Sequence, residues 1–237
     1  MRGNTYTFIF ATIICVVCGV LLSAVSEGLR QQQELNVDLD VMKNILKAVV
    51  LREPIPPATK PQKVLEIYKE KIKEEVIDDK GSVVEGRKPG DIKPDEKNFL
   101  PLYIYKEGDE VLAYAYPIVG QGLWSTLYGY FALEADAITV RGITYYKHGE
   151  TPGLGGEIES KWFQDNFKGK KIYSVKEKKL TPVQVVKGKA AQVVTGDALD
   201  SHVDGITAAT LTGVGVNEML NRTIEAYEPY FKKLRKI

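Results

Sequence analysis

An uncharged stretch near the N-terminus limits what this chain can fold into more than any other feature. Gly3–Ser26 has no charged residue, and Phe8–Val25 is almost wholly apolar. A membrane-spanning helix needs about 20 such residues, whereas the apolar core of a signal peptide has about 7–15. The length therefore favours a retained transmembrane helix at about residues 6–26, and cleavage near Ser23-Ala24 is the alternative.

The flanks of this apolar stretch give only a weak signal for its orientation. Arg2 and the amino terminus lie on one side and Arg30 on the other, and the positive-inside rule counts such short flanks. We expect the N-terminus inside and the rest of the chain outside. Cys15 and Cys18 lie within the stretch, where small thiols pack well against neighbouring helices. A redox pair or a pair of metal ligands is the alternative.

Composition and charge exclude several classes of function. The 237 residues are 44% hydrophobic and 27% charged, which suits one sizeable globular domain in addition to the apolar stretch. The net charge of +1 indicates no polyanionic partner. Because the chain has neither a basic cluster with interleaved aromatic residues nor zinc-type Cys/His spacing, we expect no nucleic-acid binding and no metal site. With only two histidines, a catalytic histidine dyad is not expected, and we predict no catalytic residue.

Two segments after the apolar stretch have helical periodicity. Val37–Leu51 places its apolar residues on one face, which predicts a docking helix. A Pro-rich break at Glu53–Pro57 follows, and Gln62–Ile77 repeats the helical pattern against an outer face rich in lysine and glutamate. Asp78–Asn98 is rich in Lys, Asp, Gly and Pro, so we expect a loop there. Residues 31–98 are therefore predicted to be a helical linker with a charged excursion.

After this linker the apolar period changes to two. A Gly-Asp pair at Gly108-Asp109 suits a hairpin turn. The expected fold class is α+β, with an antiparallel sheet flanked by helices. This domain is expected to occupy residues 99–237, after a membrane anchor of residues 1–30. The segments predicted to be strands are Leu102–Tyr105, Val111–Ile118, Thr126–Leu133 and Ile138–Tyr146.

Two loops that contain glycine lie at the ends of these strands. Val119–Leu127 holds Trp124, whose indole could lie beside a flat ring, although a tryptophan flanked by glycine is more often a core anchor. Tyr146–Glu157 is shaped by glycine and proline, and on spacing alone a plain turn is more common than a site. From the residues alone, both interpretations stay open for each loop.

The stretch Ser201–Gly215 concentrates the chemistry of the chain. Thr207 is a good N-cap residue, and the helix predicted after it, which continues over Asn217–Lys236, holds Thr210 in its first turn. The unpaired N–H groups and the positive end of the dipole attract anions there, with the dipole contributing about 0.3–1 kcal/mol when exposed. A phosphate ester on Thr210 would be well placed, although most Thr-x-x-Thr segments at helix starts are only caps.

Asp204–Thr212 resembles the flavin attachment motif of the FMN-binding domain family, Asp-Gly-x-Ser/Thr-Gly-Ala-Thr followed by Leu/Ser and Thr/Ser. In that family the last threonine of the Ser/Thr-Gly-Ala-Thr core carries FMN through a phosphoester bond. The resemblance implies covalent FMN on Thr210, with Thr207, Ala208 and Ala209 beside it. Ala208 departs from the motif, in which glycine is usual. Asp204 is expected either to hold the turn or to be recognised by a flavin transferase.

Two further segments resemble the C subunits of sodium-translocating NADH:quinone reductases. They are Gly-Leu-Trp-Ser-Thr at 122–126 and His-Gly-Glu-Thr-Pro-Gly-Leu-Gly at 148–155, and the resemblance covers nearly the whole chain. The G subunit of the related Rnf complex shares the flavin domain and is the alternative. The resemblance implies that the second loop helps to enclose the flavin, with roles for Glu150, Thr151, Leu154 and Gly155. Trp124 of the first loop is the candidate to lie beside the flavin ring.

The chain lacks nucleotide-binding motifs. Gly120-Gln-Gly122 and Gly213-Val-Gly215 lack the third glycine and the preceding strand of a dinucleotide fingerprint, and no Gly-x-x-x-x-Gly-Lys-Ser/Thr occurs. We therefore expect another chain to oxidise NADH and this chain to relay electrons. The resemblance implies that the partners are the other subunits of a membrane reductase and a flavin transferase.

The resemblance implies an electron-relay subunit of a complex that couples NADH oxidation and quinone reduction to sodium export. The expected location is the bacterial inner membrane, with one membrane pass and the soluble domain on the periplasmic side. The alternative from another class of function is an exported, non-catalytic binding module, in which the flavin attachment motif is unused.

Overall fold

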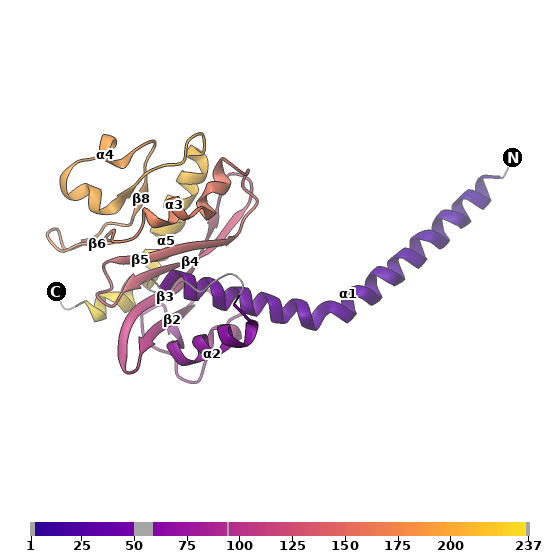
Figure 1. Ribbon diagram of the computed structural model, residues 1–237, viewed down its shortest axis with the longest axis horizontal. Coiled ribbons are helices and arrows are strands. Elements are labelled where there is room, and N and C mark those ends of the chain that lie inside the picture. Colours follow the sequence, from indigo (N-terminus) through magenta and orange to yellow (C-terminus); the bar gives the residue numbers. More distant parts are fainter. Residues whose placement is uncertain (1–2, 50–58, 94, 236–237) are drawn as a thin grey trace. The chain divides into compact units, whose positions relative to one another are not determined.

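A computed structural model of the chain describes residues 3–49, 59–93 and 95–235. The chain divides into two compact units, Met1–Val41 and Met42–Ile237. The first consists of the greater part of one helix, and the second contains the sheet with the remaining helices (Figure 1).

Helix α1 runs without a break over Asn4–Val49. Its part Asn4–Arg30 has a mean hydropathy of 2.8, and its most apolar stretch is not buried within the protein. At 1.5 Å per residue this part is about 40 Å long, which is enough to cross a bilayer. The predicted N-terminal apolar helix is therefore confirmed.

The docking helix predicted at Val37–Leu51 is wrong as a separate element, because it forms the C-terminal part of α1. Residues 31–35 are glutamines, a glutamate and a leucine, all good helix formers, so nothing interrupts the helix after its apolar part. The end of the predicted docking helix and the predicted break at Glu53–Pro57 lie outside the described residues. The predicted buried face is present, since three residues of the last turns are fully buried: Ile45, Leu46 and Val49.

The helix predicted over Gln62–Ile77 is wrong in its second half. Helix α2 covers Pro61–Lys71, and strand β1 follows at Ile72–Asp78. Strand β1 pairs antiparallel with strand β2, Phe99–Glu107, along its whole length. A face rich in lysine and glutamate suits the solvent side of a helix and of a strand equally. Pairing with a distant strand therefore decides which of the two this segment forms. The charged stretch that follows is a loop, as predicted, with one short helical turn, η1, at Pro89–Asp91.

The second unit is built on a five-stranded antiparallel sheet in the order β1-β2-β3-β4-β5. The four predicted strands are confirmed as β2 to β5, and the predicted turn at Gly108-Asp109 joins the first two of these. Gly108 has a φ of 61° in this turn, a conformation that glycine adopts without strain. The bounds of β2 to β5 are Phe99–Glu107, Glu110–Gln121, Thr126–Glu134 and Val140–Lys147.

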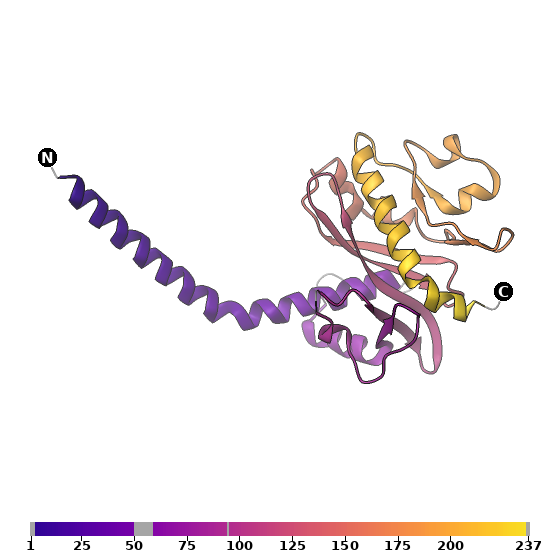
Figure 2. The same ribbon diagram turned by 180° about the vertical axis from the view of Figure 1, so that it is seen from behind.

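Helices cover both faces of this sheet (Figures 1 and 2). Helix α5, Thr210–Leu234, lies on one face, where Tyr227 stacks on Tyr116 of β3 with ring centroids 4.2 Å apart. The last turns of α1 and helix α2 lie on the other face. There, a Cβ on Gly142 of β5 would lie only 2.7 Å from the carbonyl oxygen of Ala48. The expected α+β class is therefore confirmed.

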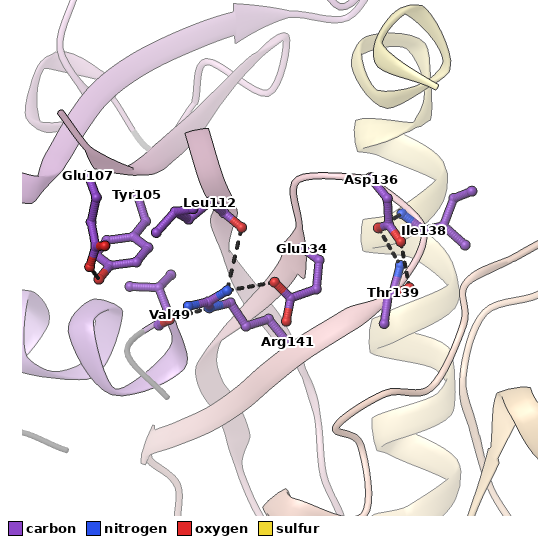
Figure 3. Close-up of polar contacts among 9 residues, drawn as sticks. All are labelled: Val49, Tyr105, Glu107, Leu112, Glu134, Asp136, Ile138, Thr139 and Arg141. Carbon is purple, nitrogen blue, oxygen red and sulfur yellow. Dashed lines mark hydrogen bonds and ion pairs between the residues drawn. The ribbon is translucent and has the colours of Figure 1, made fainter. Parts of the chain in front are cut away.

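The side chain of Arg141 joins the C-terminal end of α1 to the sheet (Figure 3). Its guanidinium donates hydrogen bonds to the carbonyl oxygen of Val49 and, at 2.6 Å, to Oε2 of Glu134. The same group lies over the ring of Tyr105, 5.4 Å from its centroid. Because the last carbonyls of a helix are unpaired and carry the negative end of the dipole, a cation at this position stabilises the helix end.

Short elements connect β5 to α5. The last of them, β9, pairs in parallel with β8, so that Val203 lies opposite Val185, and the chain then enters the segment that precedes α5. The elements are η2 (Gly155–Glu159), α3 (Lys161–Asp165), β6 (Tyr173–Ser174), β7 (Lys179–Leu180), β8 (Gln184–Val185), α4 (Ala190–Val193), η3 (Gly196–Ser201) and β9 (His202–Val203).

Candidate functional site

Helix α5 begins at Thr210, later than the sequence predicts. The N-cap predicted at Thr207 is wrong, because Ala209 is the N-cap residue and Thr207 lies exposed in the turn before it. The physical reason is Ala208, whose φ of 58° is in the left-handed region and cannot continue a right-handed helix. The helix is otherwise continuous through its glycines to Leu234, and Lys236, the predicted end, lies outside the described residues.

The hydroxyl of Thr210 is accessible at the first position of this helix. The first N–H groups of any α-helix have no partner within the helix, and the N-cap residue Ala209 makes no side-chain hydrogen bond to them. Thr210 itself is exposed. An exposed hydroxyl thus lies among N–H donors that are available to an anion.

A pocket of about 150 Å³ lies beside Thr210. Its lining is mostly apolar and includes the buried ring of Phe163. Lys187 is the charged residue of the lining, and it is exposed. The other lining residues are Ile158, Val185, Val186, Gly205, Ile206, Ala209, Gly213 and Val214.

Asp204 and Gly205 shape the turn that leads to Thr210. Asp204 accepts hydrogen bonds at 2.8 Å from both the N–H of Ala190 and the ammonium of Lys189. Burial alone raises the pKa of Asp204, but these two donors outweigh burial and hold the pKa below its usual value. Gly205 is required sterically, because a Cβ there would lie 2.0 Å from the carbonyl oxygen of Val186. Of the two roles expected for Asp204, holding the turn is the one that these contacts provide.

The side chain of Glu150 lies where three segments meet. Its Oε1 accepts hydrogen bonds from the N–H groups of Trp124 at 2.9 Å and Ser125 at 3.3 Å, and its Oε2 accepts one from the Thr212 hydroxyl at 2.7 Å. Glu150 is 5% exposed. Burial raises its pKa, but the amide and hydroxyl donors outweigh burial and keep the pKa below its usual value, so the group is an anion at neutral pH.

Apolar side chains are exposed around this meeting point. Trp124 is 69% exposed, which contradicts the alternative that it anchors the core. Thr151 and Leu154 are exposed too. The carbonyl oxygen of Thr151 closes the turn, because it accepts hydrogen bonds from the N–H groups of Leu154 and Gly156. Other exposed apolar residues near these segments in the sequence are Leu123, Leu211 and Val214.

The predicted site residues fall into two groups. Asp204, Thr207, Ala208, Ala209 and Thr210 form one continuous turn and helix start. Glu150 and Gly155 contact Thr212 on that helix, and the Trp124 main chain joins them through Glu150. Thr151 and Leu154 belong to the same turn as Glu150 and Gly155.

Sequence reasoning missed most of the apolar lining of the pocket and three polar residues of the site. Thr212 and Ser125 lie inside two of the three segments that carry the resemblance, so they could have been singled out as polar members of those segments. Lys187 carries no signal, because it is one of several lysines in a loop that is distant in the sequence.

Residues 122–225 match the FMN-binding domain family. The matched range contains the Trp124 loop, the Glu150 turn and the segment Asp204–Thr212. Fold and site therefore define an FMN-binding domain that follows an N-terminal apolar helix.

Curated relatives of nearly the same length are similar along the whole chain. The C subunit of the Na(+)-translocating NADH-quinone reductase of Vibrio alginolyticus is 32% identical, over 94% of this chain and 91% of its own length. That of Yersinia pestis is 30% identical, over 97% of this chain and 92% of its own length. The chain therefore belongs to the family formed by the C subunits of Na(+)-translocating NADH-quinone reductases.

Two solved structures have a similar fold. The crystal structure of the C subunit of the Na(+)-translocating NADH-quinone reductase from Parabacteroides distasonis has a TM-score of 0.72 at 30% identity, covering 86% of this chain and 96% of that one. NqrC from Shewanella oneidensis has a TM-score of 0.68 at 23% identity, covering 84% and 97% of the two chains, and supports the fold alone. The family predicted from the sequence is confirmed, and the similarities favour the C subunit of the reductase over the G subunit of an Rnf complex.

Proposed function

We propose that Thr210 carries FMN through a phosphoester bond and that the chain relays electrons within a sodium-translocating NADH:quinone reductase. The observation that carries the proposal is the exposed hydroxyl of Thr210 in the first turn of α5, beside a pocket that Lys187 lines, within the range that matches the FMN-binding domain. Ester formation replaces the hydroxyl proton of Thr210 by the flavin mononucleotidyl group, so the chain gains FMN less one water.

The residues around Thr210 suit the phosphate of FMN. The N–H groups of the first turn offer hydrogen-bond donors, and both the helix dipole and the Lys187 ammonium offer positive charge. Thr212, the other hydroxyl of this turn, is 1% exposed and donates to Glu150, so it does not compete for attachment. Thr207 is exposed but lies before the helix, beyond Ala208. Asp204 would keep the turn in place while a flavin transferase modifies Thr210.

The exposed apolar side chains suit the ring of the cofactor. Bound FMN supplies an isoalloxazine ring that accepts electrons and passes them on. Trp124 and Leu154 offer apolar surface to such a flat ring. Glu150, Thr151 and Gly155 would shape the main chain behind that surface. Because the tether runs through the phosphate, the ring stays free to react.

The proposed place of this chain in its complex rests on the absence of a nucleotide fingerprint from its sequence and on its N-terminal apolar helix. Another subunit would oxidise NADH, since this sequence has no nucleotide fingerprint. Residues 1–30 would anchor the chain in the bacterial inner membrane, and residues 31–98 would link the anchor to the FMN-binding domain of residues 99–237, contributing α2 and β1 to its fold. With the domain on the periplasmic side, a covalent bond would prevent loss of a cofactor that is not replenished there.

The test is the intact mass of the chain after co-expression with a flavin transferase. We expect the parent chain to gain one FMN less one water and to fluoresce in a denaturing gel. Thr210→Val should gain nothing, whereas the matched control Thr207→Val should be modified like the parent. A modified Thr210→Val chain would overturn the assignment of the attachment site.

A further inference from the structure

Glu150 makes contacts that a residue lining a ligand site does not need. Its two carboxylate oxygens face different segments: Oε1 accepts from the main chain of the loop after β3, and Oε2 accepts from the hydroxyl of Thr212 in the first turn of α5. The donors to the carboxylate, which come from Trp124, Ser125 and Thr212, are neutral groups. The carboxylate therefore acts as a bridge between two separate pieces of main chain.

Glycines on both sides allow this bridge to form. A Cβ on Gly122 would lie 2.6 Å from Oε1 of Glu150, and a Cβ on Gly155 would lie 2.7 Å from Oε2 and 2.5 Å from Oγ1 of Thr212. Real Cβ atoms do not approach oxygen so closely, so any side chain at either position would displace the carboxylate. The carboxylate is thus enclosed by main chain. It faces away from the solvent side, from which a ligand would approach.

The second loop is tied to the first at one further point, and its own main chain is also held by a local hydrogen bond. The N–H of Gly149 donates to Oγ of Ser125 at 2.5 Å, and the N–H of Glu150 donates to Nδ1 of His148 at 3.1 Å. The main chain that carries Glu150 is therefore fixed independently of its carboxylate. Its contact with Thr212 is the hydrogen bond that links this loop to the first turn of α5. The end of β3 also packs on α5 one turn later, where a Cβ on Gly215 would lie 2.1 Å from the carbonyl oxygen of Gln121.

We propose that Glu150 is a positioning residue that couples the Trp124 loop to the first turn of α5 and so sets where the indole of Trp124 lies relative to the hydroxyl of Thr210. Thr212 and Thr210 are two residues apart in one helix, so a bond that holds Thr212 also holds Thr210. The main chain of Trp124 is bonded directly to the other carboxylate oxygen. The consequence for an attached flavin rests on the proposed ester at Thr210, whereas the coupling itself does not.

The coupling is tested by amide hydrogen exchange of the full chain in detergent, before any flavin is attached. Thr212→Val removes a hydroxyl from α5, yet we expect the amides of Trp124 and Ser125, on a different loop, to exchange about tenfold faster. Glu150→Gln should have a similar effect because it removes the charge from the bridge. Thr212→Ser keeps the hydroxyl and should exchange like the parent chain. Glu218→Gln, at an exposed glutamate of the same helix, is the matched control and should change nothing.

The functional consequence is tested by fluorescence in a Trp162→Phe background, which leaves Trp124 as the single tryptophan because the chain has two. After flavin attachment, quenching of Trp124 by the flavin should fall at least about twofold in Thr212→Val and recover in Thr212→Ser. The coupling would be overturned if the amide of Trp124 exchanged at the parental rate in both Thr212→Val and Glu150→Gln. It would also be overturned if Thr212→Val and Thr212→Ser changed the exchange rate equally. If the parent chain gains no flavin mass, the proposed attachment fails, while the exchange experiment still decides the coupling.

Discussion

The guanidinium of Arg141 donates a hydrogen bond to the carbonyl oxygen of Val49, the last residue of α1. The same side chain pairs with Glu134 of β4 at 2.6 Å, and Thr144 of β5 donates to the carbonyl oxygen of Asn44 at 3.4 Å. The end of the helix that begins as the N-terminal apolar stretch is therefore held by polar groups of the sheet. These hydrogen bonds fix the orientation of the last turns of α1 on the sheet, and the buried side chains of those turns provide the apolar packing.

Arg141→Ala is expected to lower the free energy of unfolding of the domain by about 2 kcal/mol, because it leaves Glu134 and the carbonyl oxygen of Val49 without their partly buried partner. Urea unfolding of the detergent-solubilised chain, followed by tryptophan fluorescence, measures this change. Lys97→Ala, at an exposed lysine, should stay within about 0.5 kcal/mol of the parent. Equal stability of the two variants would show that Arg141 does not hold the helix end.

Ala208→Gly is expected to stabilise the protein. Ala208 has a φ of 58°, which costs a residue with a Cβ about 1–2 kcal/mol. Glycine removes that strain but loses more conformational entropy on folding, so the expected net gain is about 0.5 kcal/mol. The matched control is Ala226→Gly on the exposed side of α5, which should destabilise by about 1 kcal/mol. Thermal unfolding of both variants measures whether their changes in stability have opposite signs. A loss of stability in Ala208→Gly would contradict the claim that Ala208 strains the turn.

Asp204→Asn is expected to destabilise the protein by about 1 kcal/mol at neutral pH, because the carboxylate accepts from Lys189 and from the N–H of Ala190. The folded-state pKa of Asp204 is lowered, so its contribution is complete above its unfolded pKa of about 3.9 and is lost as pH falls through the folded pKa. The stability difference between parent and variant should therefore shrink below about pH 4. Unfolding curves from pH 3 to pH 7 measure it, with Asp79→Asn as an exposed control. A difference that does not change with pH would rule out the ionised carboxylate as the cause.

Local patterns predicted most of the sheet and the anchor helix. The strands from β2 to β5 are runs rich in aliphatic residues and tyrosines, which favour strands, and Gly108-Asp109 marks their first turn. The N-terminal apolar helix is evident from the uncharged stretch Gly3–Ser26 alone. Strand β1 was missed because its charged residues also fit a helix, and its identity depends on pairing with β2, a contact between distant parts of the chain.

The site was predictable as a set of segments but not as a set of contacts. The motif Asp204–Thr212 located the start of α5, yet a motif does not reveal the left-handed φ of Ala208 that moves the N-cap from Thr207 to Ala209. Spacing along the chain likewise does not reveal that Glu150 turns away from solvent toward Thr212, which lies 62 residues away. Such contacts arise only when separate loops are brought together by the fold.

Gly155→Ala is expected to disturb an attached flavin more than Gly153→Ala does. A Cβ on Gly155 would collide with Thr212 and Glu150, whereas a Cβ on Gly153 meets nothing and adds only the strain of a φ of 74°. Both variants should lose stability by about 1–3 kcal/mol, so stability alone does not separate them. Flavin fluorescence and the flavin midpoint potential should change in Gly155→Ala and remain close to the parent values in Gly153→Ala, with both chains still inserted in the membrane. Identical flavin spectra in the two variants would argue against the Glu150 turn shaping the flavin site.

Thr210→Val in the assembled complex is expected to separate NADH oxidation from its downstream steps. Because this chain has no nucleotide fingerprint, the complex should still oxidise NADH with artificial electron acceptors, while quinone reduction and sodium transport are lost. Free FMN should not restore them, since the tether is what keeps the ring within reach of its partners. Thr207→Val, which alters the exposed threonine of the same segment, should retain both activities. The purified parent chain should be reduced by dithionite but only slowly by NADH. Normal sodium-coupled quinone reduction in the Thr210→Val complex would refute the relay role, and so would rapid NADH oxidation by the isolated chain.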